Sequence, residues 1–79
     1  MKTEIGYLIA ETVTAVIRGE RRDALHIYDT TPDDPHGYVM FTSVVPQDLY
    51  DFYEVYFNGA ETSSDPDVLA TVEPREVRT

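Results

Sequence analysis

The shortness of the chain, combined with its lack of cysteine, most limits what it can fold into. It has 79 residues and no cysteine, so neither a disulfide nor a thiolate metal site can hold it together. A chain of this length forms one domain and buries only roughly 60–65% of the surface that it exposes when unfolded. Its stability therefore depends on a small, well-packed core, or on a core shared with a second copy, which makes a homodimer one expectation.

The N-terminal segment, residues 4–18, has two interpretations. Its apolar residues recur at the spacing of an amphipathic helix: Ile5, Leu8, Ile9, Val13, Val16 and Ile17. Arg18 followed by Gly19 is a typical helix end, and we take the helix as the first prediction. The rival is a pair of strands, because residues 12–17 are rich in β-branched side chains and Gly6 costs a helix about 1 kcal/mol. Two strands here would make the domain mostly β.

The middle of the chain predicts a β-hairpin. Residues 24–29 alternate between apolar and polar side chains, and residues 38–45 are apolar, aromatic and β-branched, so both segments are expected to be strands. Residues 30–37 lie between them and contain two prolines, two aspartates and a glycine, the residue types of a turn. The hairpin should therefore have a long acidic tip that carries Asp33 and Asp34.

Residues 46–57 give the clearest helix pattern in the chain. Pro46 suits a first helical turn, and Asn58 with Gly59 suits a helix end. Five apolar or aromatic residues follow the i, i+3, i+4, i+7, i+8 spacing: Leu49, Phe52, Tyr53, Tyr56 and Phe57. We expect this stripe to face the core.

The remaining segments complete the predicted architecture. Residues 60–67 are a polar loop, residues 68–72 a third strand, and residues 74–79 a frayed tail. The predicted fold is a single α+β domain over residues 1–73, in the order α-β-β-α-β. It has a small antiparallel sheet with two helices on one face.

The charge of the chain limits the classes of partner that it can bind. Fifteen acidic residues against six basic ones give a formal net charge of −9. Nucleic acid and anionic membranes repel such a chain, so its expected partners are basic protein surfaces or cations. Glu4 and Glu11 interrupt any apolar run near the N-terminus, so we expect a cytoplasmic protein without a membrane span. A halophilic or GC-rich host also explains acidity and a scarcity of lysine.

The predicted partner-binding residues lie mainly on the second helix. Asp48, Asp51 and Glu54 are spaced i, i+3, i+6, opposite the apolar stripe, and Tyr50 lies at the edge of that stripe. Residues three apart rise about 4.5 Å along a helix, close to the phosphate repeat of a DNA strand. With the tip residues Asp33 and Asp34, these acids either imitate a nucleic-acid backbone or form an ordinary solvated surface.

In size and charge, the whole chain resembles the small acidic nucleic-acid-mimic inhibitors of phages and mobile elements, including some anti-CRISPR proteins. Those inhibitors share no common fold, and no motif carries the resemblance. The class implies that the chain occupies the basic groove of a nuclease or a CRISPR effector complex. The predicted function is therefore a non-enzymatic acidic binding protein that blocks a basic nucleic-acid-handling surface. The alternative is a small dimeric structural or regulatory domain whose acidity reflects its host.

Catalytic and metal-binding patterns are weak in this sequence. It has no cysteine nucleophile, no glycine-rich phosphate loop and no serine elbow, so we expect neither an enzyme nor a cofactor. His36 lies near Asp33 and Asp34, but the calcium-loop pattern is absent, and we expect no metal site. Arg18, Arg21 and Arg22 form a small basic cluster. It either binds an anion, pairs with Glu20, Asp23 or acids across the fold, or interacts with the negative end of the first predicted helix.

Overall fold

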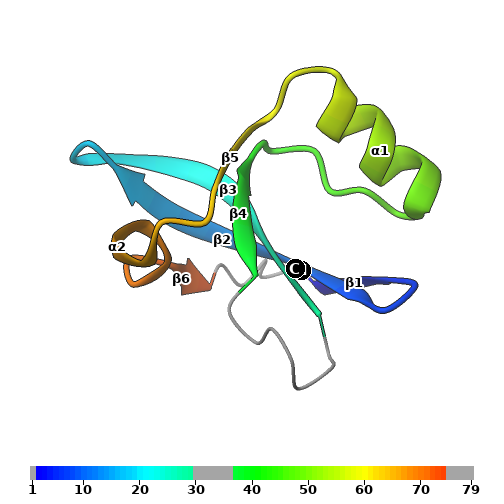
Figure 1. The fold of residues 1–79 in the computed structure, drawn as a ribbon, viewed down its shortest axis with the longest axis horizontal. Helices are drawn as coiled ribbons and strands as arrows, with labels where there is room; N and C mark the ends of the chain where they lie inside the picture. Colours follow the sequence, from blue (N-terminus) through cyan, green and yellow to red (C-terminus); the bar gives the residue numbers. More distant parts are fainter. Residues whose placement is uncertain (1, 30–36, 75–79) are drawn as a thin grey trace, which may run out of the picture.

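The computed structural model describes residues 2–29 and 37–74, which form a mostly antiparallel sheet with two short helices (Figure 1). The elements are β1 (Lys2–Ile5), β2 (Leu8–Ile17), β3 (Glu20–Asp29), β4 (Tyr38–Phe41), α1 (Leu49–Phe57), β5 (Glu61–Ser63), α2 (Pro66–Leu69) and β6 (Glu73–Pro74). The predicted α+β fold in the order α-β-β-α-β is therefore wrong. Residues 4–18 instead follow the rival interpretation, because they contribute to the two strands β1 and β2.

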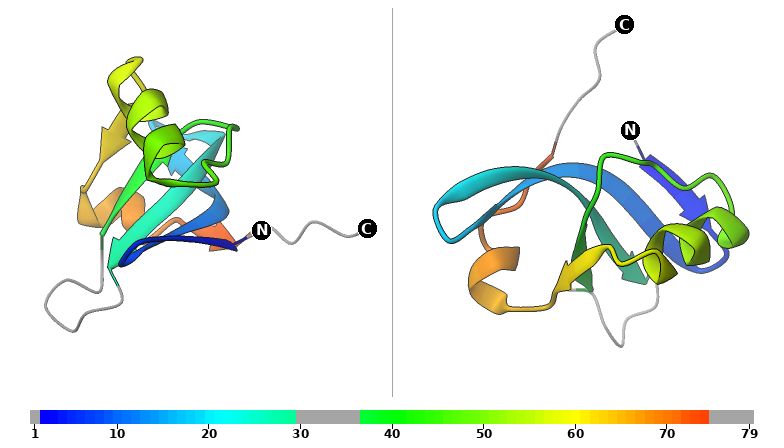
Figure 2. Two further views of the ribbon diagram at one scale, coloured as in Figure 1. Left: turned by 90° about the vertical axis from the view of Figure 1, so that its right-hand side faces the viewer. Right: turned by 90° about the horizontal axis from the view of Figure 1, so that it is seen from above.

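The sheet is an antiparallel meander in the order β1-β2-β3-β4-β5, with β6 paired to β2. One edge of β2 pairs with β3 along its whole length. The other edge is shared: β1 pairs with residues 8–11, and β6 pairs with Val13 and Thr14. The first and last strands therefore lie along the same edge of β2, as the two views in Figure 2 also show.

Both faces of this sheet are buried, which explains why β2 has the apolar spacing of a helix. Alternate residues of a strand point to opposite faces. One cluster contains Ala10, Leu25, Ile27 and Met40 beneath α1, and the other contains Val13, Ala15, Ala24, Val39 and Phe41 beneath α2. A strand that is buried on both faces has apolar residues at even and odd positions, so its pattern is not a clean alternation.

The predicted end of the N-terminal helix is the turn between β2 and β3. Ile17 pairs with Glu20, so the turn consists of the two residues Arg18 and Gly19. Both have positive φ, at 52° and 80°. Two-residue hairpin turns favour positive φ because this backbone twist matches that of the flanking strands. The glycine that resembled a helix stop therefore reverses a β-hairpin.

The central hairpin is confirmed, with different strand lengths. β3 pairs antiparallel with β4, and Leu25 lies opposite Met40. β4 ends at Phe41 rather than at residue 45. Gly37 enters β4 with φ of 58°, and a Cβ atom on it would lie 1.9 Å from the carbonyl oxygen of Ile27, so only glycine fits there. The tip that carries Asp33, Asp34 and His36 lies outside the described residues.

The C-terminal third differs from the prediction of a loop followed by a strand. β5 forms within the predicted loop, and α2 replaces the start of the predicted strand. Asp65 caps α2 by accepting a hydrogen bond from the amide of Asp67, at 2.9 Å. The Thr71 hydroxyl accepts from the Val16 amide at 2.9 Å, which ties the end of α2 to β2. Pro74, which was predicted to begin the tail, lies in β6.

Candidate functional site

The helix α1 ends as predicted, at Asn58, but it begins three residues after Pro46, which was predicted to lie in its first turn. Asp48 is the N-cap: its Oδ1 accepts a hydrogen bond from the amide of Asp51, at 2.8 Å. A capping carboxylate satisfies an amide that has no partner within the helix, and it also lies at the positive end of the helix dipole. Asn58 is the C-cap, and Gly59 follows with φ of 92°.

The stripe predicted to face the core is mostly exposed. Phe52 is the buried residue of α1 and lies in the cluster with Leu25 and Met40, and Val55 packs beside it. The other members of the stripe are exposed: Leu49 by 47%, Tyr53 by 47%, Tyr56 by 42% and Phe57 by 75%. The buried direction of α1 therefore runs through Phe52 and Val55, so the helix is rotated by roughly 100°, about one residue step, from the predicted orientation.

The exposed aromatic rings of α1 pack on one another. The Tyr53 and Phe57 rings are stacked with centroids 5.7 Å apart, and the Phe52 and Tyr56 rings are stacked at 6.2 Å. Both pairs are spaced i, i+4, which brings side chains together on one side of a helix. Tyr56 also meets Phe57 edge-on at 5.5 Å. This aromatic surface is held in place by its own contacts and by the buried ring of Phe52.

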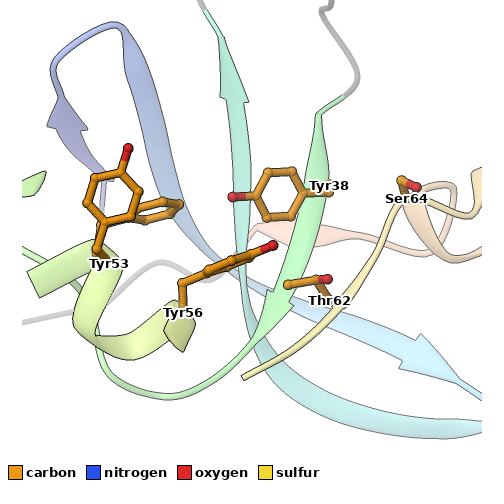
Figure 3. Close-up of a pocket in the computed structure, with 6 residues that line it drawn as sticks. Tyr38, Tyr53, Tyr56, Thr62 and Ser64 are labelled. Carbon is orange, nitrogen blue, oxygen red and sulfur yellow. The ribbon is translucent and has the colours of Figure 1, made fainter. Parts of the chain in front are cut away.

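A groove lies between the aromatic side of α1 and the strands β4 and β5 (Figure 3). Its volume is about 430 Å³, and it is lined by Tyr38, Phe52, Tyr53, Tyr56, Thr62 and Ser64. We call it the tyrosine groove. Five of these six side chains carry a hydroxyl group, and none of the six carries a charge. Figure 3 shows the rings of Tyr38 and Tyr56 bordering the same space, with the hydroxyl of Tyr56 on the side of Tyr38.

Tyr38 is the strand residue that connects the groove to the sheet. It lies opposite Ile27 and beneath the aromatic residues of α1. Burial, and then the neighbouring hydroxyls of Tyr56 and Tyr53, raise the pKa of Tyr38 above its usual value of 10.0. At neutral pH the side chain of Tyr38 is therefore an uncharged phenol. Within the described part of the chain, the hydroxyls of Tyr38, Tyr53 and Tyr56 have no hydrogen-bond partner.

The acidic residues of α1 lie beside a second depression. Asp51 and Glu54 line it together with Val44, Val55 and Asn58, and its volume is about 310 Å³. It is therefore bounded by the acidic side of α1 and by the segment that follows β4. The helix thus has an aromatic side next to the tyrosine groove and an acidic side next to this depression.

The structure brings together four of the six predicted site residues. Asp48, Asp51, Glu54 and Tyr50 all belong to α1 or its cap, and Tyr50 is 76% exposed. Asp33 and Asp34 lie outside the described residues.

Sequence reasoning missed the strand side of the tyrosine groove. Tyr38, Thr62 and Ser64 come from β4, β5 and the residue after β5. Tyr38 was placed only in a strand, and residues 62 and 64 were placed in a polar loop. The useful signal was the alternation of β4, because Tyr38 and Met40 share the face that α1 covers.

Arg21 and Arg22 of the β2–β3 hairpin pair with acids across the fold, which is one of the alternatives predicted for this basic cluster. Arg22 binds Glu61 at 2.7 Å and lies 4.5 Å above the centre of the Phe41 ring. Arg21 binds Glu73 at 3.1 Å. These contacts attach the hairpin to β5 and β6.

One polar cluster lies on the sheet face opposite α1. The Tyr28 hydroxyl donates to Glu11 at 3.4 Å, and the ring of Tyr28 lies 4.8 Å from that of His26. His26 is half-buried on β3. Among the residues that the structure describes, no three histidine or acidic side chains are grouped so that they could hold a metal ion. No helix in the described ranges has the length and apolar character needed to cross a membrane.

Comparisons of this chain with protein-family models, with curated proteins and with solved structures found no match. The case for a function therefore rests on the chemistry of α1 and the tyrosine groove.

Proposed function

We propose that this chain is a non-enzymatic acidic binding protein, and that it docks through α1 on a basic surface of a protein partner. One observation carries the proposal: α1 exposes aromatic side chains next to carboxylates. In addition, no lysine or arginine occurs from residue 23 to residue 74. A surface that otherwise holds nucleic acid, such as that of a nuclease or a CRISPR effector complex, has the complementary charge.

The two sides of α1 contribute differently to such docking. Exposed tyrosines provide contact area at a small entropic cost, and tyrosine and arginine are enriched among the residues that dominate interface energies. Carboxylates mainly set the orientation and speed of association with a basic partner. Asp51 and Glu54 are the proposed contacts, because the side chain of Asp48 caps the helix.

The experiment compares two double charge reversals that change the net charge equally. Asp51→Lys with Glu54→Lys alters α1, whereas Glu4→Lys with Glu20→Lys alters exposed acids on β1 and at the start of β3. Binding to a labelled alternating Arg–Ser peptide is measured by fluorescence anisotropy over a range of salt concentrations. We expect the α1 variant to bind about tenfold more weakly and the control at most about threefold more weakly.

Two results contradict the proposal. Equal losses in both variants mean that net charge alone attracts the peptide and that α1 is not the docking surface. Failure of the wild-type protein to bind at low salt contradicts the function itself.

A second candidate, a homodimer, is favoured by the exposed apolar side chains of Leu49 and Phe57. The two candidates differ in their response to salt. Each copy carries a net charge of −9, so salt should strengthen self-association by screening repulsion, whereas it should weaken binding to a basic partner. Sedimentation velocity at low and high salt separates them: a dimer that persists in salt and is lost with Phe57→Ala supports the second candidate.

A further inference from the structure

The tyrosine groove combines ring surfaces with hydrogen-bond acceptors. Three phenol rings, those of Tyr38, Tyr53 and Tyr56, border it, and hydroxyl oxygens occur on both its helix side and its strand side (Figure 3). The aromatic face is the negative end of the ring quadrupole, so it attracts cations. Hydroxyl oxygens accept hydrogen bonds from N–H donors. The groove therefore suits a group that is cationic, flat and rich in donors.

The groove also has the size and stiffness of a binding site. A volume of about 430 Å³ lies within the usual range of roughly 300–1,000 Å³ for ligand pockets. Tyr53 and Tyr56 are braced by their stacked neighbours Phe57 and Phe52. Tyr38 is fixed by its position in β4, opposite Ile27. Because these rings are already ordered, binding costs little further side-chain entropy.

We propose that the tyrosine groove binds an arginine side chain of the basic partner. This inference rests on the proposed function and assigns a ligand to the aromatic side of the same helix. The guanidinium group stacks on the ring of Tyr56 or Tyr53, and its N–H groups donate to hydroxyl oxygens that line the groove, including that of Tyr38. The carboxylates Asp51 and Glu54 lie on the other side of α1 and contact neighbouring basic residues of the partner.

Arginine fits this groove better than the other cationic side chains. A guanidinium has five N–H donors in a plane and stacks on aromatic rings, whereas a lysine ammonium is a compact and strongly hydrated point charge. A trimethylated lysine has no N–H donors, so it would leave the hydroxyls of the groove without partners. Among the residues that the structure describes, no carboxylate lines the groove to favour a point charge.

The test uses matched Arg–Ser, Lys–Ser, trimethyllysine–Ser and citrulline–Ser peptides of one length, with affinities measured by anisotropy. We expect the wild-type protein to bind the arginine peptide about twofold to fivefold more tightly than the lysine peptide. Citrulline keeps the shape of arginine without its charge and should bind weakly. Tyr56→Leu should remove the preference for arginine, and Tyr38→Phe, which keeps the ring, should reduce it.

Tyr7→Leu is the matched control, because Tyr7 is an exposed tyrosine in the turn between β1 and β2. It should leave the arginine preference unchanged. Equal binding of arginine and lysine peptides, unaffected by Tyr56→Leu, overturns the groove assignment while leaving the proposed function intact. Tighter binding of the trimethyllysine peptide overturns it as well. Absence of binding to every basic peptide overturns the proposed function first.

Discussion

The β2–β3 hairpin and the helix α1 have similar apolar patterns but opposite environments. In the hairpin, apolar residues on both faces of the sheet are buried, beneath α1 on one side and α2 on the other. In α1, a single ring, that of Phe52, is buried, and the other aromatic residues are exposed. Hydrophobic spacing therefore indicates which residues share a side of an element. Whether that side meets a core depends on what the rest of the chain already covers.

The difference has a physical origin in the size of the sheet. Residues of β1 to β4 already fill most of the sheet face beneath α1. From α1, Phe52 enters this core, and Val55 packs against it. Tyr53 and Tyr56 border the tyrosine groove, and Phe57 is exposed. Exposing several aromatic rings to water is unfavourable for a chain with so small a core, and binding to a partner would offset this cost.

The largest expected loss of stability distinguishes the β2–β3 hairpin from the helix α1. Leu25→Ala removes a fully buried side chain of β3 and should lower the free energy of unfolding by about 2–5 kcal/mol. Phe57→Ala removes a larger but exposed side chain and should change it by at most about 0.5 kcal/mol. Urea unfolding measures both. A loss above about 2 kcal/mol for Phe57→Ala would show that α1 is buried in solution, in a dimer or otherwise.

One substitution within the β2–β3 hairpin should raise the stability of the protein instead of lowering it. The hydroxyl oxygen of Thr12 is buried on β2 without a hydrogen-bond partner. Such a group costs about 1–3 kcal/mol, so Thr12→Val, which keeps the branched shape, should stabilise the protein by an amount of that order. Thr14→Val, at a half-buried threonine on the same strand, is the control. A destabilised Thr12→Val protein would mean that a bound water satisfies the hydroxyl.

The cap of the helix α1 should contribute measurably to stability. Asp48→Ala removes the hydrogen bond to the Asp51 amide and should cost about 1 kcal/mol. Glu54→Gln changes an exposed carboxylate without affecting the cap and should cost less than about 0.5 kcal/mol. Circular dichroism and thermal unfolding report both values. Equal effects would show that the side chain of Asp48 does not cap the helix in solution.

The smallest expected effect is the pH dependence contributed by Tyr38. Its pKa is raised in the folded state, so its contribution to stability is fully present below about pH 10 and is lost as the pH rises through the folded-state pKa. Tyr38→Phe should therefore lose less stability than the wild type between about pH 9 and about pH 11. Tyr7→Phe should behave as the wild type, because Tyr7 is exposed. Identical slopes in all three proteins would contradict the burial of Tyr38.

The sequence predicted local structure well where the pattern of residues depends on a single helix or on two neighbouring strands. The end of α1 at Asn58 and the pairing of β3 with β4 are each set by neighbouring residues or by simple alternation. The fold class was wrong because β2 is buried on both faces, so its apolar residues imitate a helical stripe. The turn at Gly19 strengthened this error, because glycine suits both a helix end and a hairpin.

The candidate site was predictable only on the helix. The acids and tyrosines of α1 follow from helical spacing, and four predicted residues lie together there. Predicting the tyrosine groove requires knowing which strand lies beside the helix. The pairing of Met40 with Thr62, which brings β5 next to β4, joins residues that no local pattern connects.

The central claim is that α1 and the tyrosine groove form the docking surface for a basic partner. A titration of the isotope-labelled protein with the Arg–Ser peptide, followed by the amide and tyrosine-ring NMR signals, tests it most directly. The account predicts that the signals that shift belong to Tyr38, to α1 and to residues 62–64. Shifts centred on the β1–β2 turn or on the face with Glu11 and His26, or no shifts at all, would contradict it.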